Sequence, residues 1–279
     1  MLAIAENSWT IFEAAHLLNR AGFGGSPSET KALHALGRTA AVDSLISPTE
    51  PLNQFPLPTW SSDDAVISDF RNRQEYREKV REAKKELNSE AAEKLQRERN
   101  QKFQRENRKQ AMEAQAWWFR RMLKTKAPLR EKMTLFWHDH FATSVQKVRE
   151  PAFLIRQNDL FRKKSLGSFK ELTQAILFDP AMLRYLDGQN SRKGNPNENF
   201  AREVMELFTL GEGNYNENDV SEAARAFTGY QFNPVRVIVT HNKRQWDPEN
   251  KTVFGKTGKY NGSDVINLYF EKKNRLVSW

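Results

Sequence analysis

The sequence predicts a mainly α fold, a multi-helix globular domain with a projecting charged helical arm or hairpin and a small C-terminal β hairpin or sheet. Three observations predict it. Helix-capping motifs recur ahead of apolar residues at helical spacing. One long stretch lacks Pro and Gly and is rich in good helix formers. Runs of β-branched residues between turn residues come late in the chain.

These patterns divide the 279 residues into five parts, and no internal repeat links them. We expect N-terminal helices of the core at 1–46, an irregular Pro-rich linker at 47–65, the charged arm at 66–123, the helical core at 124–230 and a small β-containing part at 231–279. The fold is therefore expected to hold its arm between two helical segments.

The N-terminal part marks its own helix starts. Thr10 and Glu13 have the spacing of a capping box, in which each side chain accepts from the other residue's backbone. Ser26 repeats the motif, with Pro27 at the first helical position. Residues 47–62 contain four prolines, which predicts an irregular linker.

The arm concentrates the charge of the chain. Residues 69–110 carry 14 Lys plus Arg and 9 Asp plus Glu, a net of +5 out of +9 for the whole chain. Asn88-Ser89 is the one plausible break, so a helical hairpin and one long helix both fit. A narrow apolar stripe of coiled-coil type runs through Tyr76, Val80, Ala83, Leu87, Ala91 and Leu95.

This arm is expected to be a solvated helical element that contacts a protein partner through residues 69–110. Nucleic acid is an unlikely partner, because single-strand binding needs stacking aromatics beside the charge. Aromatics are sparse in the arm, and nine acids interrupt its basic residues.

The predicted core consists of capped helices followed by β structure. Helix starts or ends are indicated at Pro128, Ser168, Asp179-Pro180, Asn195-Pro196, Gly211, Asn218 and Gly229. The first of these helices places Leu129, Met133, Phe136 and His140 on one face. Residues 235–240 and 251–254 then favour a hairpin or small sheet.

Composition excludes several classes of function. Without cysteine there is no disulfide scaffold, thiolate zinc site, cysteine nucleophile or iron–sulfur cluster. No run approaches the roughly 18 apolar residues of a transmembrane segment. The N-terminus lacks the pattern of a secretory signal, which favours a cytoplasmic location, with a periplasmic or envelope-associated location as the alternative.

His138 and His140 form the most suggestive local motif, within WHDHF. On a regular helix the two rings point about 200° apart and cannot share a metal ion. A joint site therefore requires the helix to end or distort near His138. The alternative is that these aromatic-flanked histidines are buried and hydrogen-bonded without a ligand.

A second candidate lies in NENFARE, where Glu198 and Glu206 are each four residues from Arg202. This spacing fits a structural charge ladder on one helix face. The functional alternative directs Glu203 or Arg202 inward against the histidines. One carboxylate with two imidazoles suits zinc, iron or manganese with an open position for water.

Several ordered blocks resemble a bacterial family, domain of unknown function 1800. They are HLLNRAGFG (16–24), PLREKMTLFWHDHFATS (128–144), DPAMLRYL (179–186), NPNENFARE (195–203), ELFTLG (206–211), DVSEAARAFTG (219–229) and KTVFGKTG (251–258). The resemblance covers most of the chain outside residues 47–115, where the charged arm reads as a variable insertion. It implies no assigned activity, and genes of the family often neighbour those of exported, sulfatase-like proteins.

The resemblance also singles out residues and departures. His16, His138, His140 and His241 fall in or beside matching blocks, and so they are the metal-ligand candidates that it implies. Relatives tend to have His-Asp where this chain has His241 followed by Asn, so a ligand role for that aspartate is lost. Relatives are usually longer, which leads us to expect a truncated member.

Two functional hypotheses follow. In the first, the protein is a metal-assisted hydrolase or oxidoreductase, in which His138, His140 and Glu203 bind the ion and Arg202 steers an anionic group. In the second, it is a non-catalytic binding or scaffold protein whose charged arm engages a partner or an anionic surface.

Overall fold

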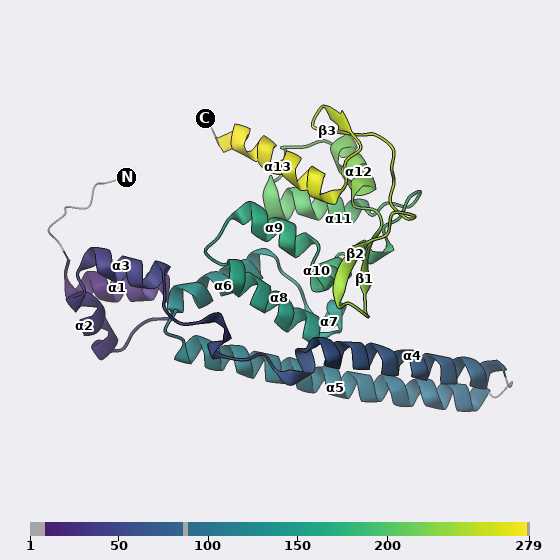
Figure 1. Cartoon of the computed structure of the whole chain (residues 1–279), viewed down its shortest axis with the longest axis horizontal. Helices are drawn as coiled ribbons and strands as arrows, with labels where there is room; N and C mark the ends of the chain where they lie inside the picture. Colours follow the sequence, from purple (N-terminus) through teal and green to yellow (C-terminus); the bar gives the residue numbers. More distant parts are fainter. Residues whose placement is uncertain (1–8, 86–88, 278–279) are drawn as a thin grey trace.

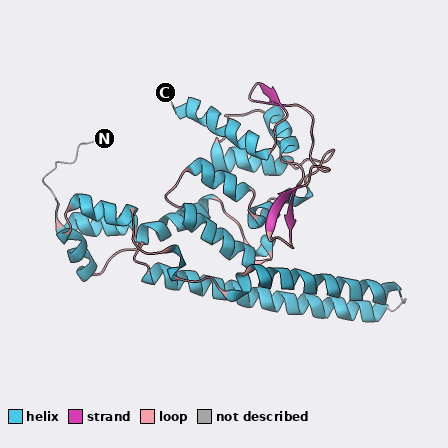
Figure 2. Ribbon diagram, viewed as in Figure 1, coloured by secondary structure: helices cyan, strands magenta, loops and turns pink. Residues whose placement is uncertain are grey.

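The computed structural model describes residues 9–85 and 89–277, with side chains described as far as Lys273. Three helices at the N-terminal end lie beside a larger helical core, and a two-helix arm runs beneath the core and projects past it (Figure 1). Helix dominates, and the strands lie at one side of the core (Figure 2). The mainly α prediction with a small β part is confirmed.

The N-terminal helices begin as their caps predict. α1 (Ile11–Ala21) and α2 (Pro27–Ala35) both start with a complete capping box, and α3 (Arg38–Ile46) follows. Leu18, Leu33 and Ala41 form the small apolar cluster that joins the three helices. Two short 3-10 turns, η1 (Leu52–Gln54) and η2 (Thr59–Ser61), carry the chain to the arm.

The arm is a hairpin of two antiparallel helices, α4 (Asp63–Lys85) and α5 (Ser89–Lys124) (Figure 1). The hairpin alternative is therefore the one observed. Of the predicted break Asn88-Ser89, Ser89 begins α5 and Asn88 lies outside the described residues. At 1.5 Å per residue, the 36 residues of α5 span about 54 Å. Towards their free ends the two helices pack mainly on each other.

A buried charge network fixes the base of α5 to the core. Glu131 of α6 (Pro128–His140) is fully buried and accepts from Arg121 Nε of α5 at 2.7 Å. It also accepts from Arg162 Nε of α8 (Pro151–Lys164) at 2.5 Å. Trp118 Nε1 and Arg162 Nη2 bond the other carboxylate oxygen. Because three helices supply these groups, the arm and the core share one interior.

The largest apolar cluster lies in the core and contains Phe141, Phe161, Leu172, Met205, Phe227 and Tyr269. The helices of the core are α6 (Pro128–His140), α7 (Val145–Val148), α8 (Pro151–Lys164), α9 (Phe169–Leu177), α10 (Pro180–Tyr185), α11 (Glu198–Glu203), α12 (Glu217–Ala226) and α13 (Gly262–Val277), with the 3-10 turn η3 (Gly188–Asn190) and the π-helical segment η4 (Val204–Thr209).

The sequence did not predict which residues of α6 are fully buried, and the predicted start of α12 was wrong. On α6, the fully buried residues are Glu131 and Thr134, whereas Phe136 of the predicted face is half exposed. The cap of α12 is Asn216, whose side chain accepts from Asp219 N, so the helix begins earlier than Asn218.

Two separate antiparallel pairs form the β part. β1 (Tyr230–Asn233) pairs with β2 (Ile238–His241), and β3 (Lys251–Val253) pairs with β4 (Lys256–Gly258). The β-rich run 235–240 thus covers a turn and most of one strand, and a long helix, α13, follows the strands. In the described ranges no helix has the length and apolar character needed to cross a bilayer.

Candidate functional site at the base of the arm

The two histidines of WHDHF face different surroundings. α6 remains helical as far as His140, so the break that a shared metal site requires is not found before that residue. The ring of His138 packs edge-on against Trp118, with ring centroids 5.1 Å apart, and its Nδ1 is buried without a hydrogen-bond partner. His140 Nε2 instead lies 3.1 Å from the carbonyl oxygen of Phe208.

The other two histidines named as metal-ligand candidates lie elsewhere. His16 is exposed on α1, and His241 of β2 stacks on Tyr230 with centroids 4.4 Å apart. Burial lowers the pKa of His138, His140 and His241, which favours neutral rings at pH 7. Across residues 9–85 and 89–273, no three or more His, Asp or Glu side chains converge in a group that could hold a metal ion.

Arg202 pairs with a residue outside the predicted ladder of Glu198, Arg202 and Glu206. Arg202 makes a two-pronged contact with Glu217, with Nη1–Oε1 and Nη2–Oε2 distances of 2.8 and 2.6 Å. This pairing raises the pKa of Arg202 and lowers that of Glu217. Glu203 is half-buried and, within the described part of the chain, has no hydrogen bond or ion pair.

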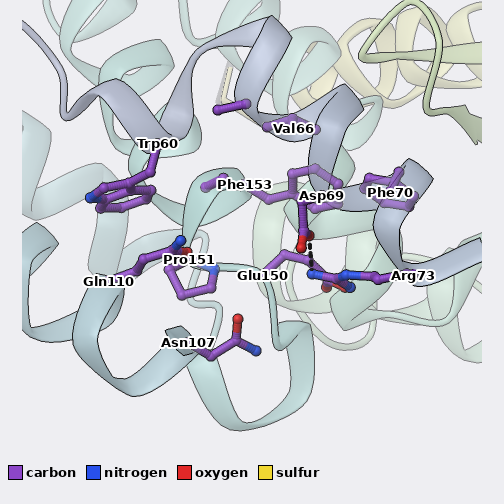
Figure 3. A pocket seen from close by; sticks show the side chains of 12 residues that line it. Trp60, Val66, Asp69, Phe70, Arg73, Asn107, Gln110, Glu150, Pro151 and Phe153 are labelled. Atoms are coloured by element: carbon purple, nitrogen blue, oxygen red, sulfur yellow. Dashed lines mark hydrogen bonds and ion pairs between the residues drawn. The ribbon is translucent and has the colours of Figure 1, made fainter. Parts of the chain in front are cut away.

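The structure instead gathers charged groups where the arm meets the core. Glu150, directly before α8, is buried, and its Oε1 accepts from Arg73 Nη1 of α4 at 2.6 Å and from Arg184 Nη1 of α10 at 2.7 Å. Arg73 Nη2 also pairs with Asp69 (Figure 3). The Arg73 guanidinium lies 3.8 Å above the centre of the Phe103 ring. One carboxylate thus joins the arm to two parts of the core.

This junction contains polar atoms without partners. Glu150 Oε2 and Arg73 Nε are both buried and have no hydrogen bond among the described residues. Both side chains border a cavity of about 120 Å³ (Figure 3). Buried polar atoms are normally hydrogen-bonded, so water or a ligand group is expected to bond them.

A second cavity, of about 250 Å³, opens on the other side of Arg73. Its lining joins α4, α10, η3 and the β1–β2 hairpin and consists of Phe70, Arg73, Gln74, Arg77, Arg184, Gln189, Phe232 and Pro234. We call this the arginine cavity. No acidic residue is part of its lining, and the three guanidinium groups make it a site for an anion.

The profile of the family described as "Protein of unknown function (DUF1800)" matches residues 16–276. The chain belongs to this family. A search of curated proteins and a search of solved structures each give no match.

In this DUF1800 member, the residues of the arginine cavity come from distant parts of the sequence. Arg73 is 77 residues from Glu150 in the sequence, and the sequence of its helix predicts only a solvated arm. Arg184 lies in the family-like block DPAMLRYL, but that block does not show which carboxylate it meets. The available local signal was Phe70 three residues before Arg73, an aromatic–cation pair, but Tyr76 and Lys79 repeat that spacing on the same helix, so it did not single out the cavity.

Proposed function

We propose that this DUF1800 chain is a non-catalytic binding protein that takes a small organic anion, a carboxylate or phosphate with an apolar body, in the arginine cavity. The observation that carries the proposal is the lining itself, which joins three guanidinium groups and two carboxamides without an acid. Guanidinium groups bind carboxylate and phosphate oxygens through paired N–H bonds.

The charge balance around the cavity favours an anion. Arg73 and Arg184 share Glu150, and Arg73 also pairs with Asp69. Arg77 is exposed and has no ion pair within the described part of the chain. Three cations thus face two carboxylates, which leaves one positive charge that a bound anion would neutralise.

The apolar part of the lining favours a ligand with a flat or hydrocarbon body. Phe70 and Phe232 lie with ring centroids 5.2 Å apart, and Pro234 continues the same wall. The volume of about 250 Å³ is below the roughly 300–1,000 Å³ of sites for drug-sized ligands. A ligand of few atoms, such as a monocyclic carboxylate or phosphate ester, therefore fits best.

Isothermal titration calorimetry with phenyl phosphate, benzoate and inorganic phosphate tests the proposal. We expect phenyl phosphate to bind more tightly than inorganic phosphate, because its ring contacts the aromatic wall. Arg77→Gln should weaken binding by about tenfold, since one charged hydrogen-bonding partner is lost.

The matched control is Arg71→Gln, which removes an exposed arginine from the same helix outside the cavity lining. It should leave the affinity unchanged. Absence of heat for all three probes, or equal affinities for the Arg77 and Arg71 variants, would reject the site.

The metal-assisted hydrolase or oxidoreductase remains a prediction from the sequence, as does a protein partner for residues 69–110. The binding protein is preferred because its groups lie together, whereas the candidate ligands His138 and His140 lie on different sides of α6.

A further inference from the structure

The outer face of α5 carries a row of exposed apolar side chains near its junction with the core. Met112, Phe119 and Leu123 are 61, 65 and 81% exposed, and Ala116 between them is exposed as well. Spacings of four, three and four residues place the row along one line, on the side of the helix opposite the buried Arg121. We call it the outer row.

A single exposed apolar residue is common, but an aligned set indicates a contact surface. From Met112 to Leu123 the outer row extends about 17 Å along the axis of α5. The outer row lies on the solvent-facing side of α5, away from the helices that α5 packs against. A protruding ridge of this kind can insert into the headgroup region of a lipid layer. A partner helix, in contrast, binds in a groove, which this surface does not offer.

Basic side chains flank the outer row. Arg105, Arg108, Lys109 and Arg120 are exposed on the same half of the helix, from one turn before Met112 to the middle of the row. The neighbouring acid Glu113 accepts a hydrogen bond from Trp60 Nε1 at 2.8 Å and pairs with Lys109 at 4.0 Å. The other three cations have no ion pair within the described part of the chain. The surface around the apolar ridge is therefore positively charged.

We infer that the outer row docks on an anionic lipid bilayer, with α5 lying along the membrane surface. An interfacial helix buries its apolar side chains at the level of the headgroups while its basic residues meet anionic lipids. Charge complementarity decides the occupant, because a second copy of this chain would bring two basic flanks together. This inference does not depend on the arginine cavity, which opens on the opposite side of the arm base.

Sedimentation with vesicles tests the inference on the full chain. We expect the protein to bind vesicles of phosphatidylcholine with 30% phosphatidylserine and to bind pure phosphatidylcholine at least about tenfold more weakly. Raising the salt concentration from about 0.05 to 0.3 M should release it, because screening weakens the basic contacts.

Two variants separate the contributions of the row and its flanks. Met112→Gln/Phe119→Gln/Leu123→Gln should lower vesicle binding about tenfold or more while retaining helix-forming residues. Arg108→Glu/Lys109→Glu/Arg120→Glu should remove the preference for anionic lipid. The matched control, Phe12→Gln, removes an aromatic residue of α1 that is more exposed than Phe119, and this variant should bind as the unchanged chain does.

Several results would overturn the inference. These are no binding to anionic vesicles by a correctly folded chain, equal binding by the triple Gln variant, or binding lost equally in Phe12→Gln. Concentration-dependent dimers in analytical ultracentrifugation that disappear in the triple Gln variant would assign the row to a second copy instead. Circular dichroism and thermal melts of every variant establish that a loss of binding is not a loss of fold.

Discussion

Replacement of Glu131 by Gln probes how the arm is held to the core. Glu131 is fully buried, as are its partners Arg121 and Arg162. Its two oxygens accept four hydrogen bonds of 2.5 to 3.2 Å from these arginines and Trp118. The amide of Gln has one accepting oxygen, so two buried guanidinium groups lose both a charge partner and hydrogen bonds.

The expected loss of unfolding free energy is about 3–5 kcal/mol, the usual cost of leaving one side of a buried ion pair unpaired. Two groups share Glu131, which places the expectation towards the upper end of that range. A single domain of this kind is stable by roughly 5–15 kcal/mol, so the variant should lose a third or more of its stability. The melting temperature should fall on the order of 10 °C.

Urea denaturation followed by circular dichroism measures this loss directly. Glu93→Gln is the matched control, because Glu93 pairs with Arg97 at 3.1 Å while both side chains are largely exposed. That exposed pair should contribute under about 1 kcal/mol. A loss below 1 kcal/mol for Glu131→Gln, equal to the control, would refute the view that the buried network anchors the arm.

Three other features, namely Asp179, Gly229 and the arm, lead to testable predictions, and the metal hypothesis leads to a fourth. Burial raises the pKa of Asp179 to about 7, so the folded state holds a proton that the unfolded state has lost. The unfolding free energy should therefore fall by about 4 kcal/mol as the pH rises from about 4 to 7. Asp179→Asn keeps a capping side chain and should flatten this dependence of stability on pH, measured by thermal melts at several pH values. Gly229→Ala should lower the unfolding free energy by about 1–3 kcal/mol more than Gly37→Ala does in the same melts. Both glycines have positive φ, but of the two only Gly229 would place a Cβ 2.7 Å from a backbone oxygen. Replacing 78–102 by a short turn should leave core stability unchanged and abolish recovery of a partner protein; unchanged recovery would count against the arm as its contact. Elemental analysis settles the remaining hypothesis: about one equivalent of zinc, iron or manganese, reduced by His140→Ala, would support a metal-assisted enzyme, and only traces of metal would reject it.

Local chemistry made most helix starts predictable from the sequence. The boxes at Thr10 and Ser26 depend on residues three positions apart, so the printed sequence contains the whole motif. The start of α12 was placed too late because Asn216 and Asn218 are both capable caps. The hydrogen bond between Asp219 N and the Asn216 side chain decides between them.

Long-range pairing is the part that the sequence did not reveal. Periodicity selected Leu129 and Phe136 as one face of α6, yet Glu131 is the residue that is buried. Two arginines from α5 and α8 neutralise it, and neither is near it in sequence. The arginine cavity was missed for the same reason, because Arg73 and Arg184 meet through Glu150 from three separate segments.

The one-ended attachment of the hairpin makes it a mechanical lever. About 27 Å of α5 lies between Ser89 and Asn107, the last residue of α5 towards the free end that lines a base cavity and that also donates to the carbonyl oxygen of Arg149. A rotation of about 10° at the base would move the far end by about 5 Å over that length. The pivot of this lever is the small set of ion pairs around Glu150, and Arg73, which belongs to the pivot, also lines both cavities. The position of the distal turns is thus set by a few charged contacts at the core.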